Sequence, residues 1–388
     1  MRDAVIVEAV RTPVGKRNGA LSGVHPVDLS ALVLTELVER TGLDPALVDD
    51  VMWGCVSQVG EQSWNIGRNA VLAAGWPESV PGTTIDRQCG SSQQAVHSAA
   101  AAVISGQAEI VVAGGVESMS RVPMGSPAAQ GPGQPFGPAM TARYAGIAFN
   151  QGVGAEQIAQ RWGLSRSQLD EFALGSHAKA AAAQDSGAFD AELVGVKTED
   201  GSVVSTDEGV RRGGTVESLA ALKTPFAEDG VVTAGNASQI SDGAAALLVT
   251  TSDRATELGL TPLVRIYAAT VAADDPVIML TAPIPATAKV LAKAGLSIDD
   301  MGVCEVNEAF ASVPLAWLAE TGADPGRLNP RGGAVALGHP LGGSGARLMT
   351  TLVHHMVDTR CSYGLQTMCE GGGMANATIL ERLASRRS

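Results

Sequence analysis

The stretch Gly82-Thr83-Thr84-Ile85-Asp86-Arg87-Gln88-Cys89-Gly90-Ser91-Ser92 joins a β-branched strand to an alanine-rich helix predicted over residues 93–105. A cysteine at such a turn faces unpaired backbone N–H groups and the positive end of the helix dipole, which favour thiolate over thiol. The pattern therefore indicates Cys89 as a nucleophile. The alternative is an inert buried cysteine that only packs.

Composition restricts the possible classes of protein. The chain has 388 residues, of which 45% are hydrophobic and 17% charged, and a formal net charge of −13. This acidic balance argues against a nucleic-acid partner, and no apolar run is long enough to span a membrane. The five cysteines show no Cys-x-x-Cys pair, so we expect neither a disulfide framework nor a metal site. Residues 1–8 resemble a strand rather than a signal peptide, which favours a cytoplasmic protein.

Strands and helices alternate through the first part of the chain. Apolar runs predict strands at residues 4–10, 51–56 and 109–115, and helical spacing predicts helices at 26–40 and 65–75. This alternation is typical of a layered α/β unit. The basic, turn-rich loop with Arg11, Lys16 and Arg17 is expected to be solvated.

Residues 118–238 differ in character. They contain many glycines and prolines and one amphipathic helix near residues 165–186. Long irregular segments inside compact domains tend to be functional. We therefore interpret this segment as an inserted lid or ligand-binding excursion.

The second half of the chain repeats the first. Aligning Asp49-Asp50 on Asp299-Asp300 sets an offset of 250, which places His339 opposite Cys89. His339 also precedes a helical pattern, and the strand at 364–368 then matches the strand at 109–115. Two copies related by a pseudo-twofold axis are predicted to bring Cys89 and His339 to equivalent helix starts.

These residues suit acyl transfer from a thioester. A cysteine that attacks a carbonyl needs a base, and neutral histidine matches that task near pH 7. Cys369 ends a strand beside the glycine triplet 371–373, where a second thiol could move a proton. The glycines let backbone N–H groups approach a developing oxyanion.

The chain resembles the thiolase family over essentially its whole length. The matching blocks are Cys89-Gly90-Ser91-Ser92, Gly235-Asn236-Ala237-Ser238, Ser241-Asp242-Gly243-Ala244-Ala245, Asn307-Glu308-Ala309-Phe310, Gly338-His339-Pro340 and Cys369-Glu370-Gly371-Gly372-Gly373. The resemblance implies an α/β, duplicated five-layer αβαβα fold with two pseudo-twofold-related halves. It assigns residues 1–117 plus about 239–262 to the N-terminal half, 118–238 to an inserted loop domain and 263–388 to the C-terminal half.

The resemblance also implies catalytic roles. Cys89 would carry the acyl group, His339 would activate it, and Cys369 would exchange a proton with the carbanion of acetyl-CoA. Asn307 would hold a water that forms one oxyanion hole with His339. The backbone N–H groups of Cys89 and Gly371 would form the other.

The implied ligand is coenzyme A, used as a co-substrate, with no tightly bound cofactor and no metal. Ser238 and Ala234 would line the pantetheine channel, Phe310 would pack beside it, and Lys223 would supply a cation near the nucleotide end. Family members generally form dimers or dimers of dimers, so a homodimer or homotetramer is expected.

The expected reaction is thiolytic cleavage of a 3-ketoacyl-CoA to acetyl- or propionyl-CoA and a shortened acyl-CoA. Short-chain acetoacetyl-CoA thiolases usually carry a histidine where this chain has Asn150. Several blocks are similar to actinobacterial thiolases of sterol side-chain breakdown, including Gly60-Glu61-Gln62-Ser63. The alternatives are a biosynthetic acetoacetyl-CoA thiolase, a condensing enzyme of the ketosynthase type and a non-catalytic acyl-CoA or sterol carrier.

Overall fold

A computed structural model describes residues 2–383 of the chain. Its core is a ten-stranded mixed sheet in the order β10-β11-β12-β9-β1-β8-β5-β3-β4, with β2 paired to β8. The strands are β1 (Val5–Arg11), β2 (Gly15–Lys16), β3 (Asp50–Gly54), β4 (Gly82–Ile85), β5 (Ile110–Ser118), β6 (Val196–Lys197), β7 (Val203–Val204), β8 (Ser241–Thr250), β9 (Val264–Ala273), β10 (Val303–Val306), β11 (Tyr363–Glu370) and β12 (Met374–Arg382). Strands β6 and β7 form a separate hairpin.

The sheet is built twice from the same plan. From its centre outward, β1, β8, β5 and β3 have the counterparts β9, β12, β11 and β10. In both halves the two outer strands of these four run parallel to each other. The halves meet where β1 pairs with β9 through Val5↔Arg265 and Ile6↔Val264. The predicted duplication is therefore present as repeated strand order.

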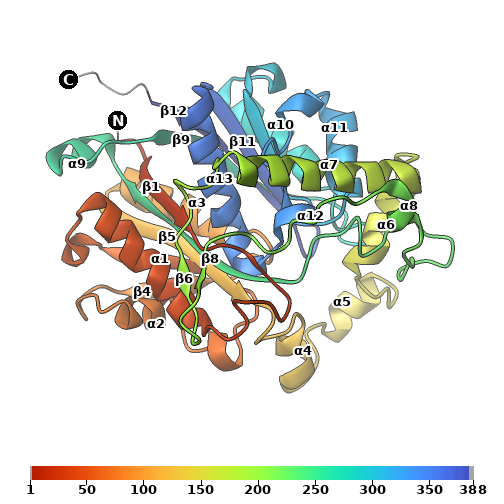
Figure 1. Ribbon diagram of the computed structural model, residues 1–388, viewed down its shortest axis with the longest axis horizontal. Helices are drawn as coiled ribbons and strands as arrows, with labels where there is room; N and C mark the ends of the chain where they lie inside the picture. The colour runs from red at the N-terminus through yellow and green to blue at the C-terminus, as the bar shows by residue number, and fades with distance from the viewer. Residues whose placement is uncertain (1, 384–388) are drawn as a thin grey trace.

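Helices cover the strands in layers. The helices are α1 (Pro26–Thr41), α2 (Ile66–Ala73), α3 (Ser91–Ser105), α4 (Ser126–Gln130), α5 (Pro138–Arg143), α6 (Gln151–Arg161), α7 (Arg166–Asp185), α8 (Val216–Ala220), α9 (Ser252–Glu257), α10 (Pro283–Ala294), α11 (Ser312–Thr321), α12 (Ala334–Leu337) and α13 (Ser344–Thr359). Helix α1 packs on the strands of the first half and α10 on those of the second, while α3 and α13 contact each other between the halves. Figure 1 shows α1 and α2 on one side of the molecule and α10 and α11 on the other.

The register of the repeat differs from the predicted one by three residues. Strand β10 begins 253 residues after β3, helix α13 begins 253 after α3, and β11 begins 253 after β5. The structural counterpart of Cys89 is therefore Gly342, and that of His339 is Asp86. The prediction that Cys89 and His339 occupy equivalent positions is wrong. Both residues still precede the paired central helices.

Glycines allow the two central helices to start close to the neighbouring backbone. A Cβ on Gly54 would lie 2.4 Å from the backbone nitrogen of Ser92, and one on Gly345 would lie 2.3 Å from that of Gln93. Atoms do not approach this closely without displacement of the backbone. The small residues thus set how far the start of α3 reaches toward α13.

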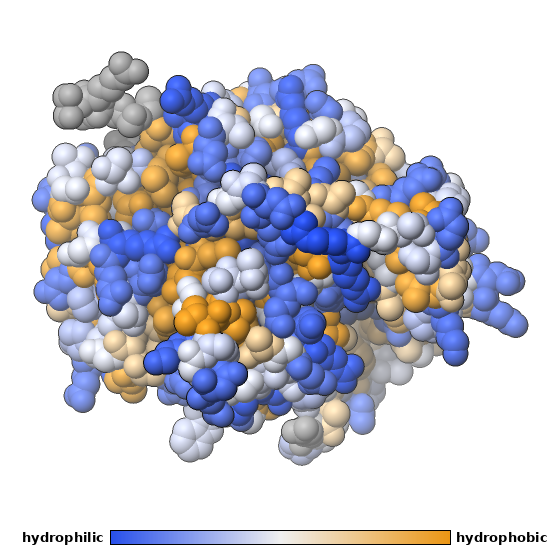
Figure 2. Space-filling view, viewed as in Figure 1, coloured by the Kyte–Doolittle hydropathy of each residue, from blue (hydrophilic) through white to orange (hydrophobic). Residues whose placement is uncertain are grey.

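Residues 119–240 carry α4 to α8 and the β6–β7 hairpin. Helix α7 packs on α12 and α6 packs on α11, so this segment lies mainly over the second half (Figure 1). The helix predicted near 165–186 is α7, which Ser165 caps through a capping box with Gln168. On the face seen in Figure 2, apolar residues are interleaved with hydrophilic ones. No helix within residues 2–383 combines the length and apolarity needed to cross a membrane.

Arg11 departs from the expectation of a solvated loop. Its side chain is fully buried, with Nε 2.5 Å from Glu192 and Nη1 2.7 Å from Asp207. Its guanidinium also lies over the ring of Phe189. Arg11, the last residue of β1, is buried because two carboxylates compensate its charge, whereas Lys16 and Arg17 are exposed as expected.

Candidate active site

Cys89 lies in the turn between β4 and α3. Gln88, the residue before it, adopts a left-handed backbone with φ of 48°, which is costly for a residue other than glycine. Cys89 is 7% exposed and packs with Met119, Leu341 and Met368. Met119 directly follows β5, Leu341 lies in the turn after His339 and Met368 is in β11, so both halves enclose the thiol.

The thiol of Cys89 is held in its protonated form. Burial, and then the charge of Glu370, raise its pKa to about 12, although the backbone N–H groups of Cys89 and Gly371 stabilise the thiolate. The expected N–H donors are thus present, yet desolvation outweighs them. Cys89 therefore needs a base to become a nucleophile.

His339 presents the nitrogen of a base. Its Nδ1 lies 2.6 Å from the hydroxyl of Ser344, and that hydroxyl donates to the carbonyl oxygen of Pro340 at 2.8 Å. Since the hydroxyl has one proton, Nδ1 must carry the hydrogen of the first bond, which leaves Nε2 as an unprotonated acceptor. Burial, and then the charge of Arg347, lowers the pKa of His339 to about 3. The imidazole is neutral throughout the neutral pH range.

Asn307 completes the side of the site near His339. Its Nδ2 lies 3.4 Å from Nε2 of His339, while its buried Oδ1 has no hydrogen-bond partner within residues 2–383. Asn307 follows β10 and receives its position from a bond of its N–H to the carbonyl of Thr367. A free buried carboxamide oxygen suits a water or a polar substrate atom.

The second thiol comes from the end of β11. Cys369 is fully buried, and its pKa is raised well above the usual value by burial and by the nearby thiol of Cys89. The turn that follows holds Gly372 and Gly373 at φ of 84° and 77°. A Cβ on Gly371 would lie 2.9 Å from Oε1 of Gln88. The glycine turn thus lets its backbone approach the residue before Cys89.

The residues proposed for coenzyme A fall into two groups. Ser238 is half-buried, donates its N–H to the carbonyl of Ala309 and lies beside Phe310, which packs in the same apolar cluster as Cys369. Ala234 and Lys223 are exposed. The structure brings Ser238 and Phe310 together near the second thiol and places Ala234 and Lys223 at the surface.

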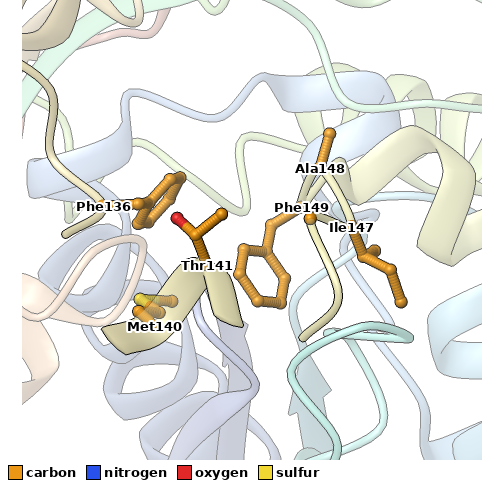
Figure 3. A pocket seen from close by; sticks show the side chains of 7 residues that line it. Phe136, Met140, Thr141, Ile147, Ala148 and Phe149 are labelled. Carbon is orange, nitrogen blue, oxygen red and sulfur yellow. The ribbon is translucent and has the colours of Figure 1, made fainter. Parts of the chain in front are cut away.

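Two further features of the inserted segment bear on the site. Asn150 is exposed and its carboxamide caps α6 by accepting from the N–H groups of Gly152 and Val153. A separate pocket, shown in Figure 3, is lined by Phe136, Met140, Thr141, Gly146, Ile147, Ala148 and Phe149. Apart from the hydroxyl of Thr141, its lining is apolar.

Sequence reasoning did not indicate the residues that hold His339 and the turn after it. Ser344 fixes the tautomer of His339, and Ser241 accepts the His339 N–H at 3.0 Å. Glu117 accepts from the N–H of Gly342 at 2.8 Å. Glu117 could have been noticed as a carboxylate that interrupts an apolar strand.

Family models match both parts of the chain. The thiolase N-terminal domain matches residues 4–253, and the thiolase C-terminal domain matches residues 260–382. The chain belongs to the thiolase family. It is accordingly an acyltransferase, and the predicted thiolase fold is confirmed.

Relatives match along nearly the full length. The chain is 50% identical to the steroid 3-ketoacyl-CoA thiolase FadA6 of Mycobacterium tuberculosis, over 99% of this chain and 95% of that protein. It is 45% identical to a 3-ketoacyl-CoA thiolase of Pseudoalteromonas translucida, over 99% and 100% of the two chains. The crystal structure of the Bacillus anthracis acetyl-CoA acetyltransferase superposes with a TM-score of 0.91 and 40% identity, over 99% of both chains.

Proposed function

We propose that this thiolase cleaves a 3-ketoacyl-CoA with coenzyme A and releases acetyl- or propionyl-CoA and a shortened acyl-CoA. One observation carries the proposal: the bond between His339 and Ser344 leaves Nε2 unprotonated in the site that also holds Cys89. The names of the full-length relatives support the substrate class. The 50% identity to a steroid thiolase supports a bulky acyl chain.

In the first half-reaction, Nε2 of His339 takes the proton of the Cys89 thiol. The sulfur forms a bond to the 3-keto carbon, and the bond between that carbon and the α-carbon breaks. The electron pair moves onto the α-carbon, which takes a proton from Cys369. Acetyl-CoA, or propionyl-CoA from an α-methyl substrate, leaves and the acyl group stays on Cys89.

In the second half-reaction, the Cys369 thiolate takes the proton of the incoming coenzyme A. The coenzyme A sulfur bonds to the acyl carbon, the bond to Cys89 breaks, and Cys89 recovers its proton from His339. We assign one oxyanion hole to the backbone N–H groups of Cys89 and Gly371, and the other to His339 and a water on Asn307. Donors fixed before reaction stabilise charge that exists only transiently.

For the ligand, we propose that Ser238 and Ala234 line the pantetheine channel beside Phe310, with Lys223 near the nucleotide end. Coenzyme A enters as a co-substrate. The two halves are residues 1–117 with about 239–262, and 263–388, with 118–238 as the inserted loop domain. Of these ranges, residue 1 and residues 384–388 lie outside the described part of the chain.

We further propose a cytoplasmic homodimer or homotetramer. Exposed apolar side chains between residues 124 and 147 of the inserted segment, at 37–51% exposure, support burial against a second copy. They are Met124, Phe136, Met140 and Ile147. Sedimentation of the purified protein tests this, and a monomer at working concentrations would contradict it.

The test of function is cleavage of a panel of 3-ketoacyl-CoA thioesters, from acetoacetyl-CoA to long-chain and steroid side-chain forms. Cleavage should depend on coenzyme A, rise with acyl bulk, vanish in Cys89→Ala and persist in Cys361→Ala. Cys361 is only partly buried and serves as a matched control.

A second candidate function is condensation of two acetyl-CoA molecules. The names of the full-length relatives do not favour it, since they are 3-ketoacyl-CoA thiolases. Asn150, which is engaged as a helix cap, does not supply a group to the thioester either. Turnover confined to acetoacetyl-CoA would support this candidate and contradict the bulky substrate.

A further inference from the structure

The 253-residue repeat places two buried glutamates at equivalent positions. Glu117 lies near the end of β5 and Glu370 ends β11, and neither side chain is exposed to solvent. Each faces the start of a central helix, Glu117 that of α13 and Glu370 that of α3. The two carboxyls differ in the partners that they meet.

The carboxyl of Glu117 accepts four hydrogen bonds. It accepts from the N–H groups of Val56, Ser57 and Gly342 at 3.0, 3.1 and 2.8 Å, and from Nε2 of Gln62 at 2.6 Å. Four donors stabilise a carboxylate. Glu117 therefore ties the turn after His339 to the first half of the molecule.

Glu370 has no such donors. Neither of its oxygens has a hydrogen-bond partner within residues 2–383. A Cβ on Gly90 would lie 2.0 Å from Oε1 of Glu370, so the carboxyl rests directly against the backbone beside Cys89. The nearby amide of Asn376 donates instead to the carbonyl of Gly90 at 3.0 Å. A buried carboxyl in this position favours the uncharged acid.

Glu370 also lies next to both thiols. Met368 is on the same face of β11, because side chains alternate along a strand, and Met368 packs against Cys89. Cys369 is its neighbour in the chain. A negative charge on Glu370 raises the pKa of Cys89 and of Cys369.

We propose that Glu370 is a positioning residue, a neutral carboxylic acid that fills the space against the Cys89 turn and whose ionisation opposes thiolate formation at Cys89. The inference rests on the proposed role of Cys89. The charged groups that face Glu370 are Arg87 and Asp86, both in the turn before α3. Burial raises the pKa of Glu370 to about 8, against a lowering by Arg87.

The consequence is a defined pH dependence of the nucleophile. Below about pH 7 Glu370 is uncharged, and the thiolate fraction of Cys89 rises tenfold per pH unit. Through the pH range in which Glu370 ionises, the new charge raises the pKa of Cys89. The reactivity of Cys89 then rises less than tenfold per unit.

The experiment measures alkylation of Cys89 by iodoacetamide from about pH 6 to about pH 10, with the label located by peptide mass. In wild type, the slope of the logarithm of the alkylation rate against pH should fall below one near pH 8. Glu370→Gln, an uncharged isostere, should keep a slope near one and react about tenfold faster than wild type at about pH 9. Glu370→Met should change the pH profile of Cys89 alkylation in the same direction as Glu370→Gln. Glu370→Asp should keep the wild-type shape of that profile. Glu109→Gln, a distant exposed site paired with Arg2, is the matched control.

Parallel profiles of wild type and Glu370→Gln, or a wild-type slope of one throughout, overturn the inference. The wild-type slope answers the question even if a variant does not fold. A purely structural role would slow Glu370→Gln equally at every pH. Full turnover in Cys89→Ala would instead contradict the proposed function, which keeps the two failures separate.

Discussion

The hydroxyl oxygen of Ser92 accepts a 2.8 Å hydrogen bond from the backbone N–H of Ala346. Ser92 is in the first turn of α3 and Ala346 in the first turn of α13. A side chain of one half thus satisfies an N–H that the other half's helix leaves unpaired. This bond fixes the starts of the two central helices relative to each other, and with them Cys89 and His339.

Ser92→Ala should lower the free energy of unfolding by about 1 to 3 kcal/mol, since the buried Ala346 N–H loses its acceptor. Denaturant unfolding measures the loss. Ser105→Ala, at the exposed far end of α3, is the control and should change stability little. Equal stability of the two variants would contradict the proposed link.

Gly90→Ala should abolish most turnover, because its Cβ would meet Oε1 of Glu370 at 2.0 Å and Nδ2 of Asn376 at 2.7 Å. The Cys89 turn must shift, and misplaced reacting groups cost roughly a hundredfold in rate. Gly175→Ala, in α7 with no atom within 4 Å of the new Cβ, should leave turnover unchanged. It should raise the free energy of unfolding by about 1 kcal/mol. Steady-state rates and denaturant unfolding of both variants test these expectations.

Ser344→Ala should lower the rate of acylation roughly tenfold to a hundredfold, because His339 loses the acceptor that fixes its tautomer. Thr359→Ala, at the exposed far end of α13, is the control. Stopped-flow measurement of acyl-enzyme formation compares the two. A rate for Ser344→Ala within twofold of the control would mean that the bond does not orient the base.

The pH profile of the wild type follows from the pKa of His339, which burial lowers to about 3. The imidazole loses its proton near that value, so above about pH 5 no further activation by His339 is expected. The ratio kcat/KM for the 3-ketoacyl-CoA should therefore show no inflection near 6.5, the ordinary value of histidine. An inflection there in wild type that is absent from His339→Asn would contradict the neutral base.

Arg11→Met should lower the free energy of unfolding by about 3 to 5 kcal/mol, because Glu192 and Asp207 lose a buried counter-charge. Arg212→Met removes an exposed pair with Asp185 and should have no measurable effect. Thermal unfolding of the two variants at neutral pH tests the difference. A similar Tm for both would contradict the structural role of Arg11.

The sequence predicts the layered α/β architecture, the duplication and the helix starts after Cys89 and His339 well, because long buried strands and a capped helix leave clear periodic patterns. The offset of the repeat was wrong for a physical reason. Asp50 begins β3, whereas Asp299 and Asp300 lie in a 3-10 turn at Ile298–Asp300. The aspartates matched by the predicted offset therefore have different backbone conformations. The correct offset of 253 aligns Val48 with Met301 instead. Both residues are buried, and each directly follows the 3-10 turn of its half.

Individual side chains of the site were less predictable. The buried state of Arg11 depends on Glu192 and Asp207, which are more than 180 residues away in the chain. The neutral state of Cys89 depends on burial by both halves, which local sequence does not report. In the sequence, Glu370 is only one residue of a family motif. Only the packed structure shows that its carboxyl lacks hydrogen-bond partners within residues 2–383.

The position of β1 has a consequence for biosynthesis. The strand Val5–Arg11 pairs with β8 and β9, and neither partner begins before residue 241. At about 5 to 20 residues per second, the first strand leaves the ribosome roughly ten seconds or more before its neighbours exist. We expect nascent chains arrested before residue 241 to keep this apolar segment open to proteases and chaperones. The central sheet is then completed late, when residues 5–11 pair with β8 and β9.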